Sequence, residues 1–155
     1  MTYLVTGGAG FIGSNFLHYI HNDTDLLEPV VVVDNLSYAA DVNFIPDSDQ
    51  FIFEWCDITN ERNVNYVFEK YKPRKIFHFA AESHVDRSIA GPGVFIESNV
   101  TGTYNLLQAV REHADGLSGE RQENFLLHHI STDEVFGSLG AEGRFSETTP
   151  YDPRS

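Results

Sequence analysis

The chain has 155 residues, of which 41% are hydrophobic, and a formal net charge of −13 at pH 7. This length suits one domain with a substantial apolar core, and the negative charge, with no offsetting Lys/Arg cluster, argues against a nucleic-acid partner. No stretch of about 18 apolar residues occurs and no basic segment precedes the apolar start, so we predict no membrane span, no signal peptide and, by default, a cytoplasmic location.

Segments typical of strands and helices alternate along the chain. The hydrophobic runs of the strand-like segments are continuous, as expected when helices cover both faces of a parallel sheet. We therefore predict an α/β fold with an open, doubly wound parallel sheet, in which residues 1–155 belong to one domain. The predicted strands are residues 2–6, 30–33, 51–55, 75–80 and 125–131, and the predicted helices are residues 11–22, 61–71 and 94–113.

Two of these segments carry further expectations. In the long helix, the apolar residues Ile96, Val100, Tyr104 and Leu107 recur at helical spacing, so we predict that this face packs on the sheet. The last strand is an apolar run and is predicted to be buried. The Gly-, Pro-, Ser- and Thr-rich residues 137–155 are predicted to form a loop.

A glycine-rich turn joins the first strand to the first helix. Gly7 permits a tight turn, Gly10 leaves room for a pyrophosphate beside the backbone, and Gly13 lets the helix lie close to the strand. Phosphates would then contact free amides at the positive end of the helix. Asp34 ends the second strand about 20 residues further on, where a carboxylate accepts the hydroxyls of an adenosine ribose. Together these features predict a dinucleotide site.

The residues after the second strand indicate which dinucleotide. Asp34 repels a 2′-phosphate, and Asn35, Leu36 and Ser37 include no arginine to bind one, so NAD is favoured over NADP. Asp57 and Ile58 end the third strand. They either flank the adenine, as an acceptor and an apolar wall, or Asp57 caps the following helix.

Cysteine and histidine residues give no sign of redox or metal chemistry. Cys56 is the only cysteine and is predicted to be a small core residue. The histidines at 78, 84, 128 and 129 lack partners at ligand spacing, so we predict no metal site.

Two motifs, HFAAESHVDRSI at residues 78–89 and STDEVFG at residues 131–137, together with the glycine spacing, resemble the extended short-chain dehydrogenase/reductase family. Within it they are similar to the dTDP-glucose 4,6-dehydratase branch, and the resemblance covers essentially the whole chain. It implies a Rossmann-type domain with the cofactor near Gly7, Gly10, Phe11, Ile12, Gly13, Asp34, Asn35, Leu36, Ser37, Asp57, Ile58, Phe79, Ala80, Ala81, Glu82, Ser83 and Ser98. Ser83 and Thr132 are implied to contact the substrate.

The resemblance also implies a reaction for the adjacent acids. In that branch NAD oxidises C4 of a nucleotide-activated hexose, water is eliminated across C5 and C6, and hydride returns to C6. Asp133 corresponds to the general acid, Glu134 to the general base, and Thr132 to the residue that hydrogen-bonds the C4 hydroxyl. Neighbours on a strand point to opposite faces, so both acids reach one sugar only if the strand stops by about residue 131 or 132. Alternatively, the acids cap a helix that begins after them.

Members of this family oxidise with a Tyr-x-x-x-Lys pair on the helix after this strand. The chain has this spacing at Tyr66/Lys70 and Tyr71/Lys75, but both pairs precede the fourth strand, so we predict that neither is catalytic. We expect the true pair and a smaller sugar-nucleotide domain beyond Ser155, so the fragment by itself is expected to be inactive. At full length we expect a homodimer that uses the helix at 94–113. A nucleotide-sugar 4-epimerase, a UDP-sugar 4,6-dehydratase and a non-catalytic dinucleotide-binding module remain alternatives.

Overall fold

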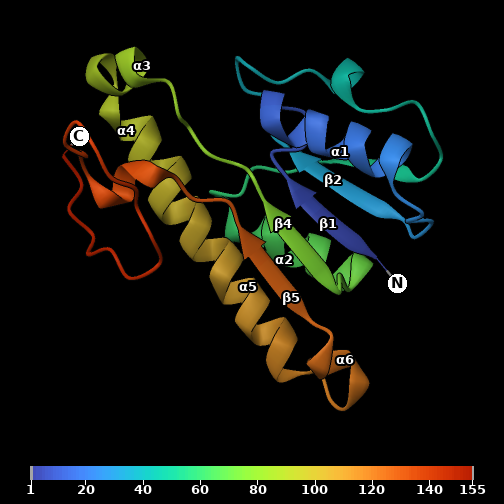
Figure 1. Cartoon of the computed structure of the whole chain (residues 1–155). Helices are drawn as coiled ribbons and strands as arrows, with labels where there is room; N and C mark the ends of the chain where they lie inside the picture. Colours follow the sequence, from blue (N-terminus) through green and yellow to red (C-terminus); the bar gives the residue numbers. More distant parts are fainter. Residues whose placement is uncertain (1, 155) are drawn as a thin grey trace.

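The computed structural model describes residues 2–154. Its centre is a five-stranded parallel sheet in the order β3-β2-β1-β4-β5 (Figure 1). Because the chain leaves β1 toward β2 and β3 and then crosses back to β4, the strand order reverses between β1 and β4. In such sheets, ligands bind at the carboxyl ends of the strands at that reversal. The strands are β1 (Tyr3–Thr6), β2 (Val30–Asp34), β3 (Phe51–Trp55), β4 (Lys75–His78) and β5 (Leu126–His129).

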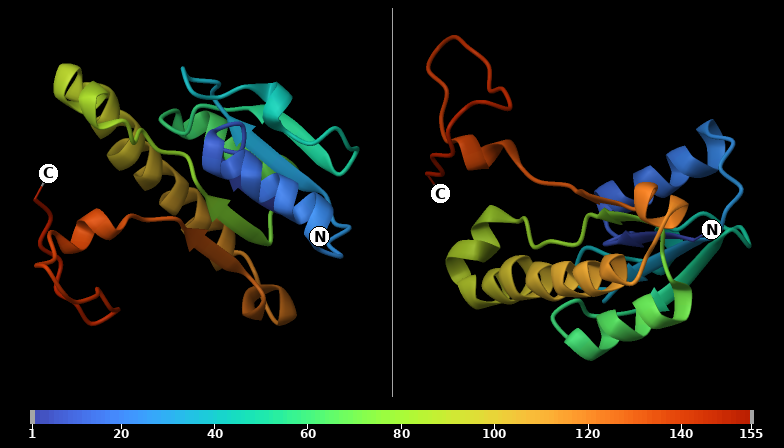
Figure 2. Two further views of the ribbon diagram at one scale, coloured as in Figure 1. Left: turned by 45° about the horizontal axis from the view of Figure 1, so that its top comes forward. Right: turned by 90° about the horizontal axis from the view of Figure 1, so that it is seen from below.

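Helices lie on both faces of the sheet, so the fold class predicted from the sequence is confirmed. Seen along the layers in Figure 2, α1 covers one face, and α2 and α5 lie together on the other. The helical segments are α1 (Phe11–Asp23), η1 (Val42–Phe44), α2 (Glu61–Tyr71), α3 (Val85–Ala90), α4 (Pro92–Phe95), η2 (Ile96–Gly102), α5 (Thr103–Asp115), α6 (Glu120–Glu123) and η3 (Asp133–Phe136).

The sheet separates two apolar cores. Successive residues of a strand point to opposite faces, so Leu4 packs with the residues of α2 and α5, whereas Val5 packs with Leu17 and Ile20 of α1. All five residues of β2 are buried, which explains the unbroken Val30–Val33 run. This central position fixes Asp34, the last residue of β2, at the edge where the strands end.

The long helix differs from the sequence prediction in which face it buries. Residues 92–115 run through α4, a π-helical segment η2 and α5. The residues that face the core are Gly102, Asn105, Leu106 and Ala109, whereas the predicted stripe is exposed, with Ile96 60%, Val100 58%, Tyr104 59% and Leu107 45% accessible. The prediction was wrong because small residues allow the closest approach: a Cβ on Gly102 would lie 2.7 Å from Ile58 Cγ1.

The last strand is also less buried than its apolar sequence indicated. β5 pairs only with β4 and forms the edge of the described sheet. Leu126 is 44% exposed and only Leu127 packs against the larger core. The predicted burial of this strand is therefore wrong for the described residues.

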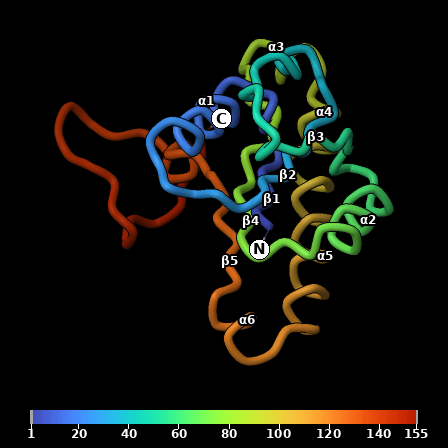
Figure 3. The backbone as a smooth tube through the Cα atoms, turned by 90° about the vertical axis from the view of Figure 1, so that its right-hand side faces the viewer, coloured from blue at the N-terminus to red at the C-terminus, as the bar shows by residue number. Residues whose placement is uncertain are grey.

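Beyond β5 the chain leaves the sheet. The tube in Figure 3 shows residues after η3 as a long loop that stands apart from the strands, as the composition of this segment predicts. Phe136 stacks on Phe145 and contacts Tyr151, so the loop folds back on η3. Within residues 2–154, no helix has both the length and the apolar character needed to cross a membrane.

Candidate functional site

The turn between β1 and α1 is built by glycine where other residues do not fit. Gly7 has φ +70°, and a Cβ there would lie 2.5 Å from the Ala80 nitrogen. A Cβ on Gly13 would lie 2.2 Å from the Gly7 carbonyl oxygen. Gly10 caps α1 without a side-chain hydrogen bond. Residues 10–13 border an open space, so the first amides of α1 lie beside a place that suits an anion.

Asp34 ties β2 to this turn. Its Oδ2 accepts the Ala9 N–H at 3.1 Å and its Oδ1 accepts the Leu36 N–H at 2.9 Å. Burial raises the pKa of the Asp34 carboxyl, and the backbone N–H groups partly offset that rise. Because the Ala9 N–H occupies one lone pair of Oδ2 and the Leu36 N–H one of Oδ1, both oxygens keep lone pairs that can accept ribose hydroxyls.

A cleft of about 240 Å³ opens at the point where the strand order reverses. Most of the residues expected near a cofactor line it, from the glycine turn, the end of β2 and the segment after β4. The lining residues are Gly7, Gly10, Phe11, Ile12, Gly13, Val33, Asp34, Asn35, Ser37, Tyr38, Ala39, Ala40, Cys56, Ile58, Phe79, Ala80, Ala81, Glu82, Ser83 and Ser98.

Two expected residues do not line the cleft. Leu36 has φ 55° and gives its N–H to Asp34, so its place in the turn is structural. Asp57 Oδ1 accepts the Thr59 N–H at 2.9 Å and the Thr59 hydroxyl at 2.8 Å. Asp57 thus fixes the turn before α2, but Asn60 caps that helix by accepting the Arg62 and Asn63 N–H groups, so the capping alternative for Asp57 is wrong. Its neighbour Ile58 does line the cleft.

Sequence reasoning missed Val33, Tyr38, Ala39, Ala40 and Cys56. Tyr38 to Ala40 directly follow Ser37, so the only available signal was their position in the same loop. Cys56 was expected in the core and is 3% exposed, yet it also lies at the cleft wall, where burial raises the pKa of its thiol to about 12.

Asn99 fixes the segment that follows β4. Its Oδ1 accepts the Glu82 N–H at 2.8 Å and its Nδ2 donates to the Glu82 carbonyl at 2.8 Å. The side-chain amide thus satisfies both backbone groups of one residue, as a neighbouring strand would. Since Asn99 is in η2, the long helix sets the position of Glu82 and Ser83 at the cleft.

A buried histidine lies beneath the same region. His78 Nδ1 is 2.6 Å from Thr6 Oγ1 and its Nε2 is 3.2 Å from Thr103 Oγ1. Thr6 Oγ1 also accepts the Ala80 N–H at 3.4 Å. We assign the proton of the neutral ring to Nε2, because the Thr6 hydroxyl can then donate to Nδ1. Burial, with a smaller contribution from His129, lowers the pKa of His78 to about 4.

Asp133 and Glu134 lie on a turn that follows the carboxyl end of β5. β5 ends at His129, so the strand stops before residue 131, as predicted. Asp133 and Glu134 are exposed and begin the short helix η3, and Thr132 Oγ1 caps it by accepting the Glu134 N–H at 3.2 Å. Thr132, not the acids, is thus the capping residue, and its hydroxyl hydrogen stays available for another acceptor.

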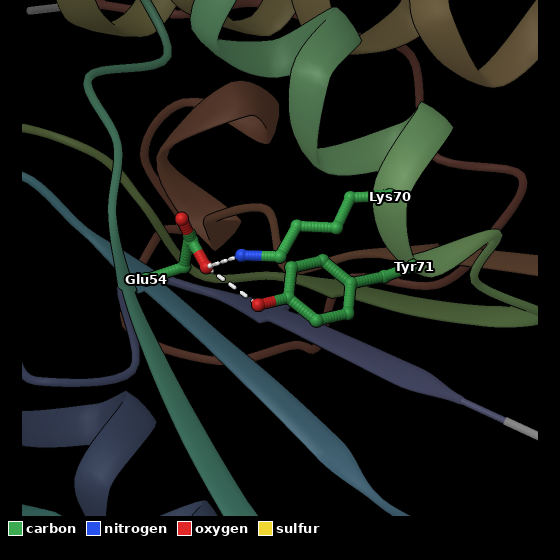
Figure 4. Close-up of polar contacts among 3 residues, drawn as sticks. All are labelled: Glu54, Lys70 and Tyr71. Atoms are coloured by element: carbon green, nitrogen blue, oxygen red, sulfur yellow. Dashed lines mark hydrogen bonds and ion pairs between the residues drawn. The ribbon is translucent and has the colours of Figure 1, made fainter.

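Neither Tyr-x-x-x-Lys pair lies at the cleft. Figure 4 shows Lys70 and Tyr71 of α2 pointing to Glu54 of β3, on the far side of the sheet from α1. The Tyr71 hydroxyl donates to Glu54 Oε2 at 2.5 Å and Lys70 Nζ lies 2.9 Å from the same oxygen. The hydrogen bond from Tyr71, followed by that from Lys70, lowers the pKa of Glu54.

Among residues 2–154, no group of three or more His, Cys, Asp or Glu side chains is arranged to hold a metal ion. The parallel sheet, the glycine turn and the cleft at the strand-order reversal define a Rossmann-type domain of the dinucleotide-binding class. A family model described as GDP-mannose 4,6 dehydratase matches residues 4–155. The chain belongs to that family.

Individual relatives point to one branch of the family. A dTDP-glucose 4,6-dehydratase of Salmonella typhimurium is 43% identical over 167 residues, covering 100% of this chain and 46% of the relative. A crystal structure of dTDP-glucose 4,6-dehydratase from Bacillus anthracis in complex with NAD has a TM-score of 0.80 and 36% identity. The matched region covers 100% of this chain and 45% of the Bacillus anthracis chain.

UDP-glucose 4-epimerase from Thermus thermophilus, also in complex with NAD, has a TM-score of 0.80 and 30% identity. The matched region covers 100% of this chain and 45% of the epimerase chain. The backbone fold therefore does not distinguish the two chemistries. The chain spans about half the length of each of these relatives.

Proposed function

We propose that this chain binds NAD in the cleft between the glycine turn, Asp34 and residues 79–83. The buried Asp34 carboxylate carries the proposal, because it stands at the end of β2 with lone pairs for two ribose hydroxyls. The pyrophosphate would contact the first amides of α1, where Gly10 leaves room for it and Gly13 lets the helix lie close to the turn. The negative charge of Asp34 favours NAD over NADP.

The single tryptophan gives a direct test. Trp55 is 58% exposed, and its indole N–H donates to the Asn35 carbonyl at 3.2 Å, beside the cleft. Titration of the chain with NADH should change Trp55 fluorescence, and NADPH should bind at least about tenfold more weakly because its 2′-phosphate meets Asp34. Absence of NADH binding to the folded chain would overturn the proposal.

We further propose that the protein containing this chain dehydrates a nucleotide-activated hexose, dTDP-glucose, to the 4-keto-6-deoxy sugar. The observation that favours it is the Thr132-Asp133-Glu134 turn at the sheet edge that carries the cleft. Bound NAD would supply a reversible hydride acceptor. Thr132 would hydrogen-bond the C4 hydroxyl and Ser83 would contact the sugar.

Asp133 and Glu134 would divide the elimination between them. Glu134 would remove the C5 proton while Asp133 protonates the departing C6 hydroxyl, so that a C5=C6 double bond forms and water leaves. In the protein as encoded in full, Asp133→Asn and Glu134→Gln should each lower the rate of water loss by about 100-fold or more. Release of deuterium from C5-labelled substrate would separate the two roles, because only Glu134→Gln should block it.

For the chain as given, we propose NAD binding without turnover. Both Tyr-x-x-x-Lys pairs lie outside the cleft, and Lys70 and Tyr71 are engaged by Glu54. Incubation with NAD and dTDP-glucose should give no 4-keto product, and a measurable amount would contradict this. The location in the cytoplasm stays a prediction.

A 4-epimerase is the second candidate, because its structural similarity is as high. An epimerase inverts C4 without loss of water, so mass spectrometry of the sugar product distinguishes the two. The acids at 133 and 134 favour dehydration, since inversion at C4 needs no group at C5 or C6.

We also propose a homodimer at full length through the exposed stripe at Ile96, Val100, Tyr104 and Leu107. Apolar side chains aligned on one helix face and exposed to this degree are typical of an interface. Light scattering should show a dimer that Val100→Glu disrupts, and a monomeric parent would contradict the proposal.

A further inference from the structure

An arginine at the cleft's mouth has an unusual partner. Arg87 of α3 lies over the ring of Tyr38, with its Cζ 3.6 Å from the ring centroid. Tyr38 lines the cleft, in the loop that follows Asp34. The adjacent Asp86 forms no ion pair within 4.0 Å among residues 2–154. Arg87 therefore interacts with a ring instead of a carboxylate.

The contact joins two segments that are far apart in sequence and lie on opposite sides of the cleft. The loop with Tyr38 continues β2, whereas α3 continues the segment after β4, whose residues 79–83 line the other wall. Figure 3 shows the loop after β2 and α3 next to each other at the end of the molecule where the strands finish. The side chains thus connect the loop after β2 to the segment after β4, the two strands that flank β1 in the sheet.

Both partners are exposed, so the bridge can open without disrupting the core. Tyr38 is 52% exposed and Arg87 is also exposed. A cation–π contact of this kind contributes about 0.5–1 kcal/mol, and less than a buried ion pair. The planar guanidinium stacked on the ring keeps its edge N–H donors available. A contact of this strength slows the separation of Arg87 from Tyr38, yet it can break each time a ligand enters or leaves the cleft.

We propose that Arg87 and Tyr38 form a clasp across the cleft that retains the bound dinucleotide. The proposal rests on NAD binding in this cleft and adds two positioning residues to it. NADH leaves when the clasp opens, so removal of either partner increases its dissociation rate. Arg87 acts through Tyr38, and therefore its effect disappears when the ring is absent.

The test is a double-mutant cycle on the NADH dissociation rate, measured by stopped-flow displacement of NADH with excess NAD. Arg87→Ala should raise the rate about two- to fivefold in the parent, the range expected for an exposed cation–π contact. In a Tyr38→Leu background the same substitution should have no effect. Tyr38→Phe, which keeps the ring, should retain most of the slow release.

Two controls separate the clasp from a general effect of charge. Arg121→Ala in α6 removes the same charge at an exposed position away from the cleft and should leave release unchanged. The ratio of NADH to NADPH affinity should be unchanged by Arg87→Ala, because a selective loss of NADPH would mean that Arg87 binds the 2′-phosphate instead. Equal effects of Arg87→Ala with and without the ring would overturn the clasp while NAD binding stands.

A measurement without cofactor keeps the clasp testable if the chain does not bind NADH. Hydrogen exchange in the free chain should speed up both in residues 35–41 and in residues 84–91 after either Arg87→Ala or Tyr38→Leu, and not after Arg121→Ala. Failure of NADH to bind overturns the proposed function, whereas unchanged exchange in either segment overturns the clasp.

Discussion

The side-chain amide of Asn99 forms two hydrogen bonds, both 2.8 Å long, with the backbone N–H and carbonyl of Glu82. We expect Asn99→Asp to break this pairing, because a carboxylate can accept the Glu82 N–H but repels the carbonyl. The free energy of unfolding should fall by about 1–3 kcal/mol. Urea denaturation gives this value, and hydrogen exchange should locate the loosening at residues 80–83.

A matched control for Asn99 is Asn15→Asp. Asn15 also lies in a helix and is exposed, but its Nδ2 makes one bond, to the Phe11 carbonyl of its own helix. Its substitution should leave exchange at residues 80–83 as in the parent. If both variants loosen that segment equally, Asn99 does not position it.

Gly13 has no room for a side chain. A Cβ there would lie 2.2 Å from the Gly7 carbonyl oxygen, which is backbone and cannot move without displacing the turn. Gly13→Ala should lower the free energy of unfolding by about 3 kcal/mol or more and abolish NADH binding. Gly93→Ala is the control, since nothing lies within 4 Å of a Cβ at that helical position. Its stability should change by less than about 1 kcal/mol, and equal losses would contradict the steric argument.

The buried His78 makes stability depend on pH. Its folded-state pKa, lowered from 6.5 to about 4, means that the unfolded chain binds a proton in the intervening pH window while the folded chain does not. Stability contributed by the neutral ring is therefore complete above about pH 6.5 and is lost as pH falls toward 4, by at most about 3 kcal/mol.

Urea denaturation of the parent and of His78→Asn between pH 4 and 7.5 isolates this dependence. Desolvation also lowers the pKa of His113, so part of the pH dependence of the unfolding free energy is expected to persist in the His78→Asn variant. The difference between the two curves should shrink as pH falls. Parallel curves would mean that His78 is not the titrating group.

Tyr71 secures α2 to β3 and does not line the cleft. Tyr71→Phe removes the donor to Glu54 and should lower the free energy of unfolding by about 1–2 kcal/mol. NADH affinity should stay the same, because Tyr71 does not line the cleft. Tyr19→Phe, at a 55% exposed tyrosine of α1, is the comparison and should change neither quantity. A weaker affinity for NADH after Tyr71→Phe would contradict the separation of this cluster from the cleft.

The sequence predicted most of the residues that line the cleft, because the residue types needed there depend on the backbone. Gly7 and Gly13 are required by a positive φ and by close approach, and Asp34 by the end of a buried strand, all of which leave a local signature. Leu36 and Asp57 also fit the local pattern, but they do not line the cleft, and each takes part in a hydrogen bond of its own turn.

The long helix was interpreted incorrectly because periodicity identifies an apolar face without identifying what covers it. Ile96, Val100, Tyr104 and Leu107 form such a face, yet Gly102 and Ala109 bring the opposite face against the sheet. The size of the residues, not their hydropathy, decides the contact here, because close packing against Ile58 leaves no space for a Cβ at 102.

By itself, the sequence determined the five strands to within a few residues, the helices α1 and α2, the long helix at 94–113 and the glycine turn, since each depends on near neighbours in the chain. Only the tertiary structure decided which distant residues meet: Arg87 with Tyr38, Asn99 with Glu82, and His78 between two threonines. Such contacts depend on how strands and helices pack in three dimensions. The spacing of residues along the chain therefore does not reveal which distant residues come into contact.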